Sequence, residues 1–289
     1  MPVHDELGLR IKNNYEKISQ TKLMRRCPVM LRLDGKAFHS FTRGFNRPFD
    51  NILVESMQET MKYLCENIQG CVLGYTQSDE ITLILIDYQK HTSQAWFDYR
   101  TDKMCSIAAS MATMAFNKAF SKNIKRYDME WKCSLTPQCV EIQARHYEYI
   151  ETLTKAVEKG AMFDCRCFNI PKEEVTNCIY WRQVDATRNS IQMVGQANFS
   201  HKELDGKKQN DIQDMLMIQK GINWNDFPTH LKRGSCCIKT TTTITCATEI
   251  DGEVKTWATE RPHWFVDMEI PIFKNEGREY IEKLINVDE

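Results

Sequence analysis

The 289-residue sequence lacks long hydrophobic runs, internal repeats and low-complexity segments. A transmembrane helix needs about 18 or more consecutive apolar residues, so no membrane span is expected. The first residues, MPVHDELGLRIKNNYEK, are charged and contain no apolar region behind a basic start, which gives no support to a secretory signal. These absences predict a soluble protein, with the cytoplasm as its default location.

Paired cysteine motifs are also missing, although the chain contains 12 cysteines. The closest pairs are Cys165 with Cys167 and Cys236 with Cys237, and neither has the C-x2-C spacing that structural zinc sites use. Cysteines scattered through a large chain without a secretory signal are more typical of reduced thiols than of a disulfide framework. We therefore expect free thiols, buried in strands as small hydrophobic side chains.

An excess of one charge is absent as well, because 38 basic residues face 39 acidic ones and the net charge is −1. Bulk electrostatic attraction therefore gives no argument for nucleic-acid binding, which would need local basic patches. Any single patch is more often a solvated face than a binding site. The candidate patches are Lys22 with Arg25 and Arg26, the segment 118–126, His201 with Lys202, Lys207 with Lys208, and Lys232 with Arg233.

Apolar stretches in the first half of the chain predict strands. Residues 28–33 (PVMLRL) are typical of a buried strand, and they end at the turn signal Asp34-Gly35. Two further stretches, 72–75 and 81–86, flank the polar residues 76–80. This pattern predicts a β-hairpin with a polar tip.

Helical patterns separate these strands. Apolar side chains recur at helical spacing over 51–67, and a helical pattern rich in Ala and Met follows from about 93 to 120. Residues 163–170 (FDCRCFNI) predict another strand. The order strand, helix, strand, strand, helix, strand is that of the split βαβ or ferredoxin-like arrangement, so we expect an α+β fold with an antiparallel sheet.

Two aspartates stand at the ends of these predicted strands. The first strand should lie beside the hairpin, so Asp34 at one strand end can approach Asp79 at the hairpin tip. Adjacent carboxylates repel each other unless a cation or proton lies between them, and oxygen ligands of this kind suit Mg²⁺. Gly35 would let the backbone approach a metal or phosphate, whereas Glu80 should point to the opposite face. Each aspartate alone is an ordinary turn residue, but the pair predicts phosphoryl transfer with two metal ions.

Three segments resemble one known family, the tRNA-histidine guanylyltransferase family of 3′-to-5′ polymerases. They are RLDGKAFHSFTRGFNRPFD, GYTQSDEITLIL and YWRQVDATRNS, and the resemblance extends from about Arg25 to about residue 235. It implies a palm-like domain with two Mg²⁺ ions held by Asp34, the Gly35 carbonyl and Asp79. In this family the 5′-monophosphate of a tRNA is activated with a nucleoside triphosphate, ATP or GTP. The 3′-hydroxyl of an incoming nucleotide then attacks the activated end.

The resemblance also implies substrate contacts at matching positions. Arg47 stands where the family has a lysine, and a guanidinium keeps the charge there. A basic residue on a helix face is usually solvated, however, and an asparagine such as Asn223 can simply cap a turn. The nucleotide-binding candidates are Arg32, Lys36, Ala37, Phe38, His39, Arg47, Ser78, Lys103 and Ser106, and the RNA-binding candidates are Arg166, Arg188, Asn223, Lys207 and Lys208.

One departure from the family pattern concerns the reaction. Residues 187–192 (TRNSIQ) replace the HINNLY-type sequence of true tRNA-histidine guanylyltransferases, including its histidine. This favours the Thg-like branch, which resembles template-dependent enzymes that rebuild truncated tRNA 5′ ends. Addition of G−1 to tRNA-histidine is the alternative within the family.

The predicted organisation is one compact unit over 1–289. Within it we expect a palm-like core over 25–172, interrupted by an inserted helical arm at about 124–162. A C-terminal α/β extension over 173–289 would serve substrate binding and assembly, and the family resemblance implies a homotetramer. The arm could contact RNA or a partner subunit, or serve only solubility.

Two alternatives of other classes stay open. Nucleotidyl cyclases also place two carboxylates on a first strand and hairpin, but QSDE departs from their GG(D/E)EF-like hairpin. A non-catalytic RNA- or nucleotide-binding protein could keep the same fold. Against this, a module that binds phosphates has no need of two adjacent carboxylates.

Overall fold

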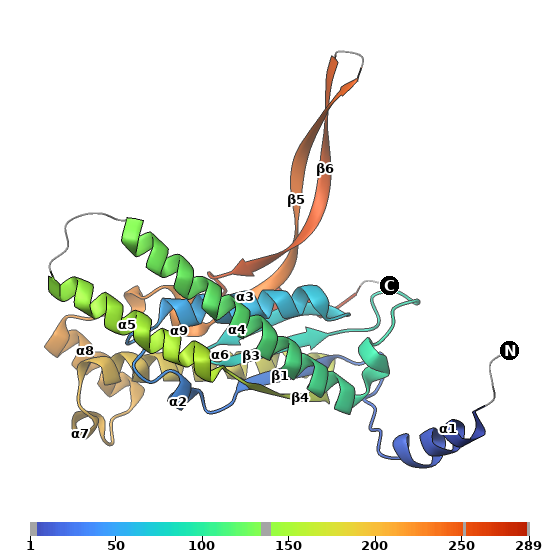
Figure 1. Cartoon of the computed structure of the whole chain (residues 1–289), viewed down its shortest axis with the longest axis horizontal. Helices are drawn as coiled ribbons and strands as arrows, with labels where there is room; N and C mark the ends of the chain where they lie inside the picture. Colours follow the sequence, from blue (N-terminus) through green and yellow to red (C-terminus); the bar gives the residue numbers. More distant parts are fainter. Residues whose placement is uncertain (1–4, 134–139, 251–252, 288–289) are drawn as a thin grey trace.

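A six-stranded antiparallel sheet forms the centre of the computed structural model, which describes residues 5–133, 140–250 and 253–287. The strands lie in the order β4-β1-β3-β2-β5-β6. The β5–β6 hairpin extends beyond the other strands and projects from the body as a two-stranded arm (Figure 1). The strands are β1 Val29–Gly35, β2 Cys71–Gln77, β3 Glu80–Leu85, β4 Phe163–Asn169, β5 Ser235–Ile250 and β6 Glu253–Asp267.

The predicted order of elements is confirmed. β1 is followed by α3 (Asn51–Asn67), then by β2 and β3, then by the long helix α4 (Thr101–Cys133) and β4. These four strands take the spatial order β4-β1-β3-β2, and each neighbouring pair is antiparallel. The chain therefore has the expected α+β fold with a split βαβ core.

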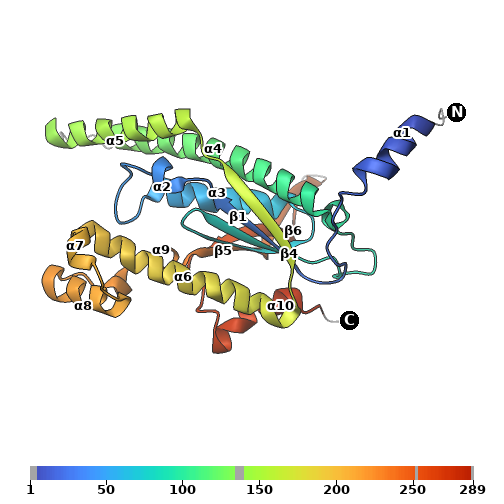
Figure 2. The same cartoon turned by 90° about the horizontal axis from the view of Figure 1, so that it is seen from below.

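Helices cover both faces of the sheet (Figure 2). α3 and α4 lie on one face, while α6 (Lys172–Asn198) and α10 (Glu279–Ile285) lie on the other. In β1, Leu31 and Leu33 belong to the core beneath α3 and α4, whereas Met30 packs in the second core beside α6 and α10. A strand buried on both faces has no alternation of apolar and polar residues, which explains the continuous apolar run at 28–33.

Helix α4 (Thr101–Cys133) differs from the helix predicted at about 93–120. It begins later, because Trp96 and Tyr99 are buried in a turn where Phe97 and Asp98 have positive φ. It also ends later, because α4 continues to Cys133. Asn123, beyond the predicted end, is fully buried and donates a hydrogen bond of 3.1 Å to Ser56 on α3. Packing against α3 therefore extends the helix past the point where its apolar pattern weakens.

The predicted inserted arm, about 124–162, is also different in detail. Its first residues are the end of α4, and α5 (Val140–Lys159) then returns beside α4 (Figure 1). Leu153 and Ala156 of α5 are buried in the main core. The base of this helical pair is thus part of the folded body, and the segment 134–139 between the helices lies outside the described residues.

The C-terminal region adds helices around α6. Ile212, Leu216 and Trp224 form a small core with residues of the second half of α6. No helix in the described part of the chain is long and apolar enough to cross a membrane. The added elements are α7 His201–Leu204, α8 Gln209–Lys220, η3 Trp224–Asp226, α9 Thr229–Arg233 and η4 Asn275–Arg278, while α1 Glu6–Ile11, η1 Lys12–Glu16 and α2 Phe38–Phe41 come from the N-terminal part.

The ten cysteines whose side chains are described are all free thiols, as expected from the sequence. Not all of them are buried, because six are partly exposed and Cys133 is exposed. Cys139 and the side chain of Cys246 lie outside the described part.

Candidate active site

The end of β1 and the tip of the β2–β3 hairpin bring the two predicted aspartates together. Asp34 lies opposite Glu80 in the β1–β3 pair, and the Gly35 N–H donates a hydrogen bond of 3.1 Å to the Asp79 carbonyl. Ser78, with a φ of 50°, makes the tight turn that presents Asp79 at the hairpin tip. The juxtaposition that the predicted topology required is therefore present.

The electrostatics of this pair favour a cation. Burial raises the pKa of Asp79, a hydrogen bond of 3.0 Å from the Ser78 hydroxyl lowers it, and the charge of Asp34 raises it further. Arg166 lies 4.0 Å from the Asp34 carboxylate, but 3.8 Å from Asp164 as well. The Arg166 guanidinium is thus shared between Asp34 and Asp164. A further positive charge between Asp34 and Asp79 would relieve the repulsion of these two carboxylates.

Gly35 has a steric reason for its identity. A Cβ at this position would lie 2.3 Å from the ring of Phe38, which is far inside van der Waals contact. Phe38 is itself fixed in an aromatic cluster with Phe116 and Phe163. Ala37, with a φ of 54°, turns the chain from β1 into α2 directly above this cluster. The Phe38 ring therefore packs directly against the backbone at Gly35, which also lines the cavity described next.

A cavity of about 650 Å³ opens at this end of the sheet. Its walls are the Gly35–Asp50 loop, the hairpin tip, and Met193 and Gln196 from the second half of α6. This volume lies within the range of small-molecule and cofactor sites. The sequence-predicted residues that line it are Gly35, Ala37, Phe38, His39, Arg47, Ser78 and Asp79.

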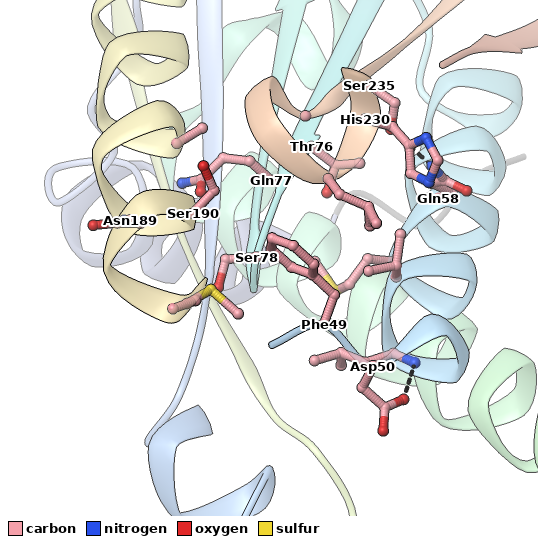
Figure 3. A pocket seen from close by; sticks show the side chains of 17 residues that line it. Phe49, Asp50, Gln58, Thr76, Gln77, Ser78, Asn189, Ser190, His230 and Ser235 are labelled. Atoms are coloured by element: carbon pink, nitrogen blue, oxygen red, sulfur yellow. Dashed lines mark hydrogen bonds between the residues drawn. The ribbon is translucent and has the colours of Figure 1, made fainter. Parts of the chain in front are cut away.

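A second, smaller cavity of about 80 Å³ adjoins the first, and the two share Asp50, Ser78 and other lining residues. Figure 3 shows it between α3, the end of β2, α6 and α9. Gln58 is held against Ser235 by a hydrogen bond of 3.1 Å. Burial lowers the pKa of His230 in this wall, and its Nδ1 has no hydrogen-bond partner.

A third cavity, of about 440 Å³, lies beside the second half of α6 and the 199–206 segment. Arg47 and Gln196 line both this cavity and the cavity of about 650 Å³. Arg47 is exposed between them. Its guanidinium can therefore meet an anionic group from either side.

Arg32 has a different environment from that of the other nucleotide-binding candidates. Its guanidinium lies 3.3 Å from Glu80 and 5.3 Å from the centre of the Trp181 ring, on the α6 face of the sheet. Glu80 also accepts hydrogen bonds of 2.7 and 2.8 Å from Arg182. The expectation that Glu80 turns away from the hairpin-tip site is thus met, and Arg32 turns with it.

Lys103 and Ser106 are not brought to the cavity. They are exposed on the first turns of α4, where the Thr101 carbonyl lies beside Cys167. The part of α4 beside the candidate site is near Thr113, which hydrogen-bonds to the Phe163 N–H at 3.2 Å. A helix rises about 1.5 Å per residue, so Lys103 is roughly 15 Å from that level.

Of the RNA-binding candidates, too, some lie beside the candidate site and others lie away from it. Arg166 lies beside Asp34, whereas Arg188 lines a separate cavity of about 390 Å³ on the far side of α6. Lys207 and Lys208 are exposed before α8. Asn223 caps η3 by accepting a hydrogen bond of 3.1 Å from the Asn225 N–H, which is the structural role weighed against a functional one.

Several cavity residues had no signal in the sequence. Asp50 caps α3 and also accepts a hydrogen bond of 2.6 Å from Tyr149 on α5. Met193, Gln196 and His230 reach the cavities from segments more than 100 residues beyond Asp79. Only the path of α6 back along the sheet, with α9 packed beside it, places them there.

Comparison with known proteins identifies the family. The model of the tRNAHis guanylyltransferase family, Thg1, matches residues 10–171, which include both aspartates. The chain belongs to the tRNA(His) guanylyltransferase family. The members of this family are nucleotidyltransferases that act on tRNA, and this chain is such an enzyme.

Similar structures extend the match beyond this segment. A bacterial tRNA(His) guanylyltransferase (Thg1)-like protein in complex with ATP is 38% identical, with a TM-score of 0.75, and the match covers 98% of this chain and all of that one. A bacterial Thg1-like protein in complex with GTP is 36% identical, with a TM-score of 0.70 and coverage of 97% and 99%. The similarity thus includes α6 and the C-terminal region.

Curated relatives are more distant. The uncharacterized protein R259 of Acanthamoeba polyphaga mimivirus is 30% identical over 244 residues, which are 80% of this chain and 76% of the relative. The tRNA(His) guanylyltransferase of Saccharomyces cerevisiae is 25% identical over 227 residues, 74% of this chain and 83% of the relative.

Proposed function

We propose that this chain is a 3′-to-5′ nucleotidyltransferase that activates the 5′-monophosphate of a tRNA with a nucleoside triphosphate and then adds nucleotides to that end. The observation that carries the proposal is the cavity of about 650 Å³ with Asp79 and Gly35 in its wall and Asp34 beside it. The bacterial Thg1-like structures with ATP and with GTP support a triphosphate as its ligand.

The site residues fit Mg²⁺. Asp34, Asp79 and the Gly35 carbonyl would supply hard oxygen ligands, and the Phe38 ring packed against Gly35 fixes the backbone at this position. The described residues contain no group of three or more His, Cys, Asp or Glu that could hold a metal, so substrate phosphates and water would complete the coordination. When bound, two such ions activate an attacking oxygen and stabilise a leaving one.

The chain's own residues then bind and orient the substrates. Arg47 would hold phosphate groups where the cavities of about 650 and 440 Å³ meet. Arg166, beside Asp34, would contact the 5′ end of the RNA. Lys103 and Ser106 stay candidates only for a substrate or subunit that approaches the first turns of α4.

Template-dependent repair of the tRNA 5′ end is the finer proposal. It is supported by residues 187–192, which depart from the HINNLY-type sequence, and Asn189 and Ser190 of this stretch line the small cavity beside the site (Figure 3). Addition of G−1 to tRNA-histidine is the alternative, and the curated guanylyltransferase relatives support it.

A single assay separates these reactions. The purified protein receives a 5′-radiolabelled monophosphorylated tRNA that lacks its first nucleotide, with Mg²⁺, ATP and each nucleoside triphosphate in turn. Extension only with the nucleotide that complements the opposing base supports repair, whereas addition of G to intact tRNA-histidine regardless of the opposing base supports the alternative. A failure to modify any tRNA, with retained binding of ATP or GTP, would favour a non-catalytic nucleotide-binding role.

A homotetramer is the proposed assembly. The β5–β6 arm projects from the body (Figure 1). Large apolar side chains on its strands are exposed, including Ile244, Trp257 and Phe265. Exposed apolar side chains on such an arm are typical of interaction surfaces. Light scattering coupled to size-exclusion chromatography gives the mass directly, and a monomer at micromolar concentration would contradict the proposal.

A further inference from the structure

Three cysteines meet between the start of α4 and the edge strand β4, away from the cavities described above. The Sγ atoms of Cys105 on α4 and Cys167 on β4 lie 3.4 Å apart. Cys165 lies two residues earlier on the same face of β4, close enough for its thiol to lower the pKa of Cys105. All three side chains are partly exposed, so small reagents can reach them.

The surroundings favour an ionised Cys105. Hydrogen bonds from Cys165 and Cys167 lower the pKa of Cys105 to about 6, although burial and the nearby Asp102 act in the opposite direction. Burial and hydrogen bonding to Cys105 raise the pKa of Cys167 to about 12. A thiol of lowered pKa with a second thiol 3.4 Å away is the arrangement of a nucleophilic sulfur with a resolving partner at hand.

We propose that Cys105 and Cys167 form a reversible disulfide when the protein meets a peroxide, with Cys105 as the attacking sulfur and Cys167 as the resolving one. The Sγ–Sγ distance of 3.4 Å needs to shorten by roughly 1.4 Å to reach the length of a disulfide bond. The bond would tie the first turns of α4 to β4, the strand that pairs with β1.

The chemistry balances with peroxide as the two-electron oxidant. The Cys105 thiolate attacks one peroxide oxygen, the O–O bond breaks, and the released hydroxide takes a proton to leave a sulfenic acid and water. Cys167 then attacks the sulfenic sulfur, the S–O bond breaks, and the departing hydroxide takes the Cys167 proton to form a second water. A thiol reductant reverses the bond by exchange.

A second thiol cluster provides an internal control. Cys65 and Cys237 are buried in the main core, with Cys71 beside them at its margin. Burial and the neighbouring thiols raise the pKa of Cys65 well above its ordinary value. Proximity of thiols is therefore present in both clusters, whereas an accessible thiolate is present only at Cys105.

The decisive experiment is a peptide map of the full chain. Reduced protein is treated with hydrogen peroxide, remaining thiols are blocked, and trypsin is added without reductant. Cleavage after Arg166 separates the two cysteines of β4, so Cys167 lies in peptide 167–172 and Cys105 in peptide 104–118. We expect these two peptides to be joined, and the join to disappear on treatment with dithiothreitol. No join, or a join between other cysteines, overturns the proposal.

Variants assign the roles. Cys167→Ser should leave Cys105 as a sulfenic acid that dimedone traps, and Cys105→Ser should abolish both products. Cys165→Ser should keep the disulfide but slow its formation. Cys133→Ser, at an exposed cysteine outside the cluster, should change nothing. Equal dimedone labelling in the Cys105→Ser and Cys167→Ser variants would overturn the assignment.

The rate of alkylation gives a second readout that needs no variant. A thiol of pKa about 6 is mostly ionised at pH 7, but its intrinsic nucleophilicity is lower. These two effects leave a net advantage of about three- to sixfold over an ordinary thiol in reaction with iodoacetamide. Cys105 should be labelled faster in the folded protein than in the isolated peptide 104–118, and slower labelling in the folded protein would contradict an accessible thiolate.

Discussion

Asp79 and Glu80 are neighbours in the sequence, yet they occupy opposite electrostatic environments. Asp79 faces the cavity at the end of the sheet, where the Ser78 hydroxyl donates to it and the charge of Asp34 opposes its ionisation. Glu80 faces α6, where Arg182 donates two hydrogen bonds to it and Arg32 lies 3.3 Å away. One carboxylate lacks a dedicated cationic partner among the described residues, and the other has two.

This difference is the one expected between a residue that serves the proposed chemistry and a residue that holds the fold. An uncompensated carboxylate beside another is unfavourable in the isolated protein and becomes favourable only when a cation binds. A buried carboxylate with matched arginines instead holds β3 against α6, and its removal leaves Arg32 without its carboxylate partner and Arg182 with Asp185 alone. A substitution at Asp79 should therefore reduce activity without destabilising the fold, whereas a substitution at Glu80 should chiefly reduce stability.

The largest expected effect is the loss of activity in Asp79→Asn. This substitution keeps the size of the side chain but removes the charge that would bind Mg²⁺, so nucleotide addition should fall by about a thousandfold or more. The 5′-extension assay measures this loss, and circular dichroism should show an unchanged fold because Asp79 lies at a hairpin tip. Retained turnover would refute the assignment of the metal site.

The next largest effect concerns the stability of Glu80→Gln. Arg182 is almost fully buried and would keep only Asp185, at 2.9 Å, as a carboxylate partner, so the loss of the Glu80 charge should lower the free energy of unfolding by about 1.5–3 kcal/mol. Urea denaturation measures this change. The double variant Glu80→Gln with Arg182→Met should recover part of the loss, because it no longer buries a guanidinium that has lost one of its two carboxylate partners.

A smaller effect compares Arg47 with Lys103. Arg47→Ala should raise KM for the nucleoside triphosphate about tenfold, the loss of roughly one charge-assisted hydrogen bond, while Arg47→Lys keeps most of the affinity. Lys103→Ala, roughly 15 Å along α4 from the level of the site, should leave KM unchanged in the same steady-state assay. A larger effect at Lys103 would show that a substrate or second subunit reaches the first turns of α4.

Much of this arrangement could be predicted from local patterns. The strand at 28–33 and the hairpin tip are short, strongly patterned segments, and their order alone implies that Asp34 and Asp79 approach each other. The bounds of α4 were harder, because the turn with positive φ at Phe97 and Asp98 has no clear sequence signal. Its far end depends on Asn123 packing against α3.

The walls of the cavities could not be predicted for a related reason. Met193 and Gln196 are ordinary residues of a long helix, and only the tertiary path of α6 places them opposite Asp79. Arg32 is the opposite case, a residue that was predicted at the site and lies elsewhere. Its position two residues before Asp34 suggested a nucleotide contact. The alternation of β1 instead turns its side chain toward Glu80 and Trp181.

The smallest expected effect is a gain in stability in the same Asp79→Asn variant. This gain is the most direct test of the difference between Asp79 and Glu80. The pKa of Asp79 is raised in the folded protein, chiefly by burial, so the folded state binds its proton more tightly than the unfolded state does. The stability that the folded protein gains from protonated Asp79 is therefore complete below the unfolded pKa of about 3.9. It is lost as the pH rises through the pKa of Asp79 in the folded protein.

Asparagine at position 79 carries no charge, so the variant should be more stable than the parent chain by an amount on the order of 0.5–1 kcal/mol at pH 7 without metal. The gain should shrink as the pH falls toward 4, where Asp79 is increasingly protonated in both states. Melting temperatures measured without Mg²⁺ and across this pH range test the sign. Adding Mg²⁺ should stabilise only the parent chain, because the ion binds the folded form through the carboxylate that the variant lacks. A variant that is less stable than the parent chain in metal-free buffer at pH 7 would mean that Asp79, like Glu80, serves to hold the fold.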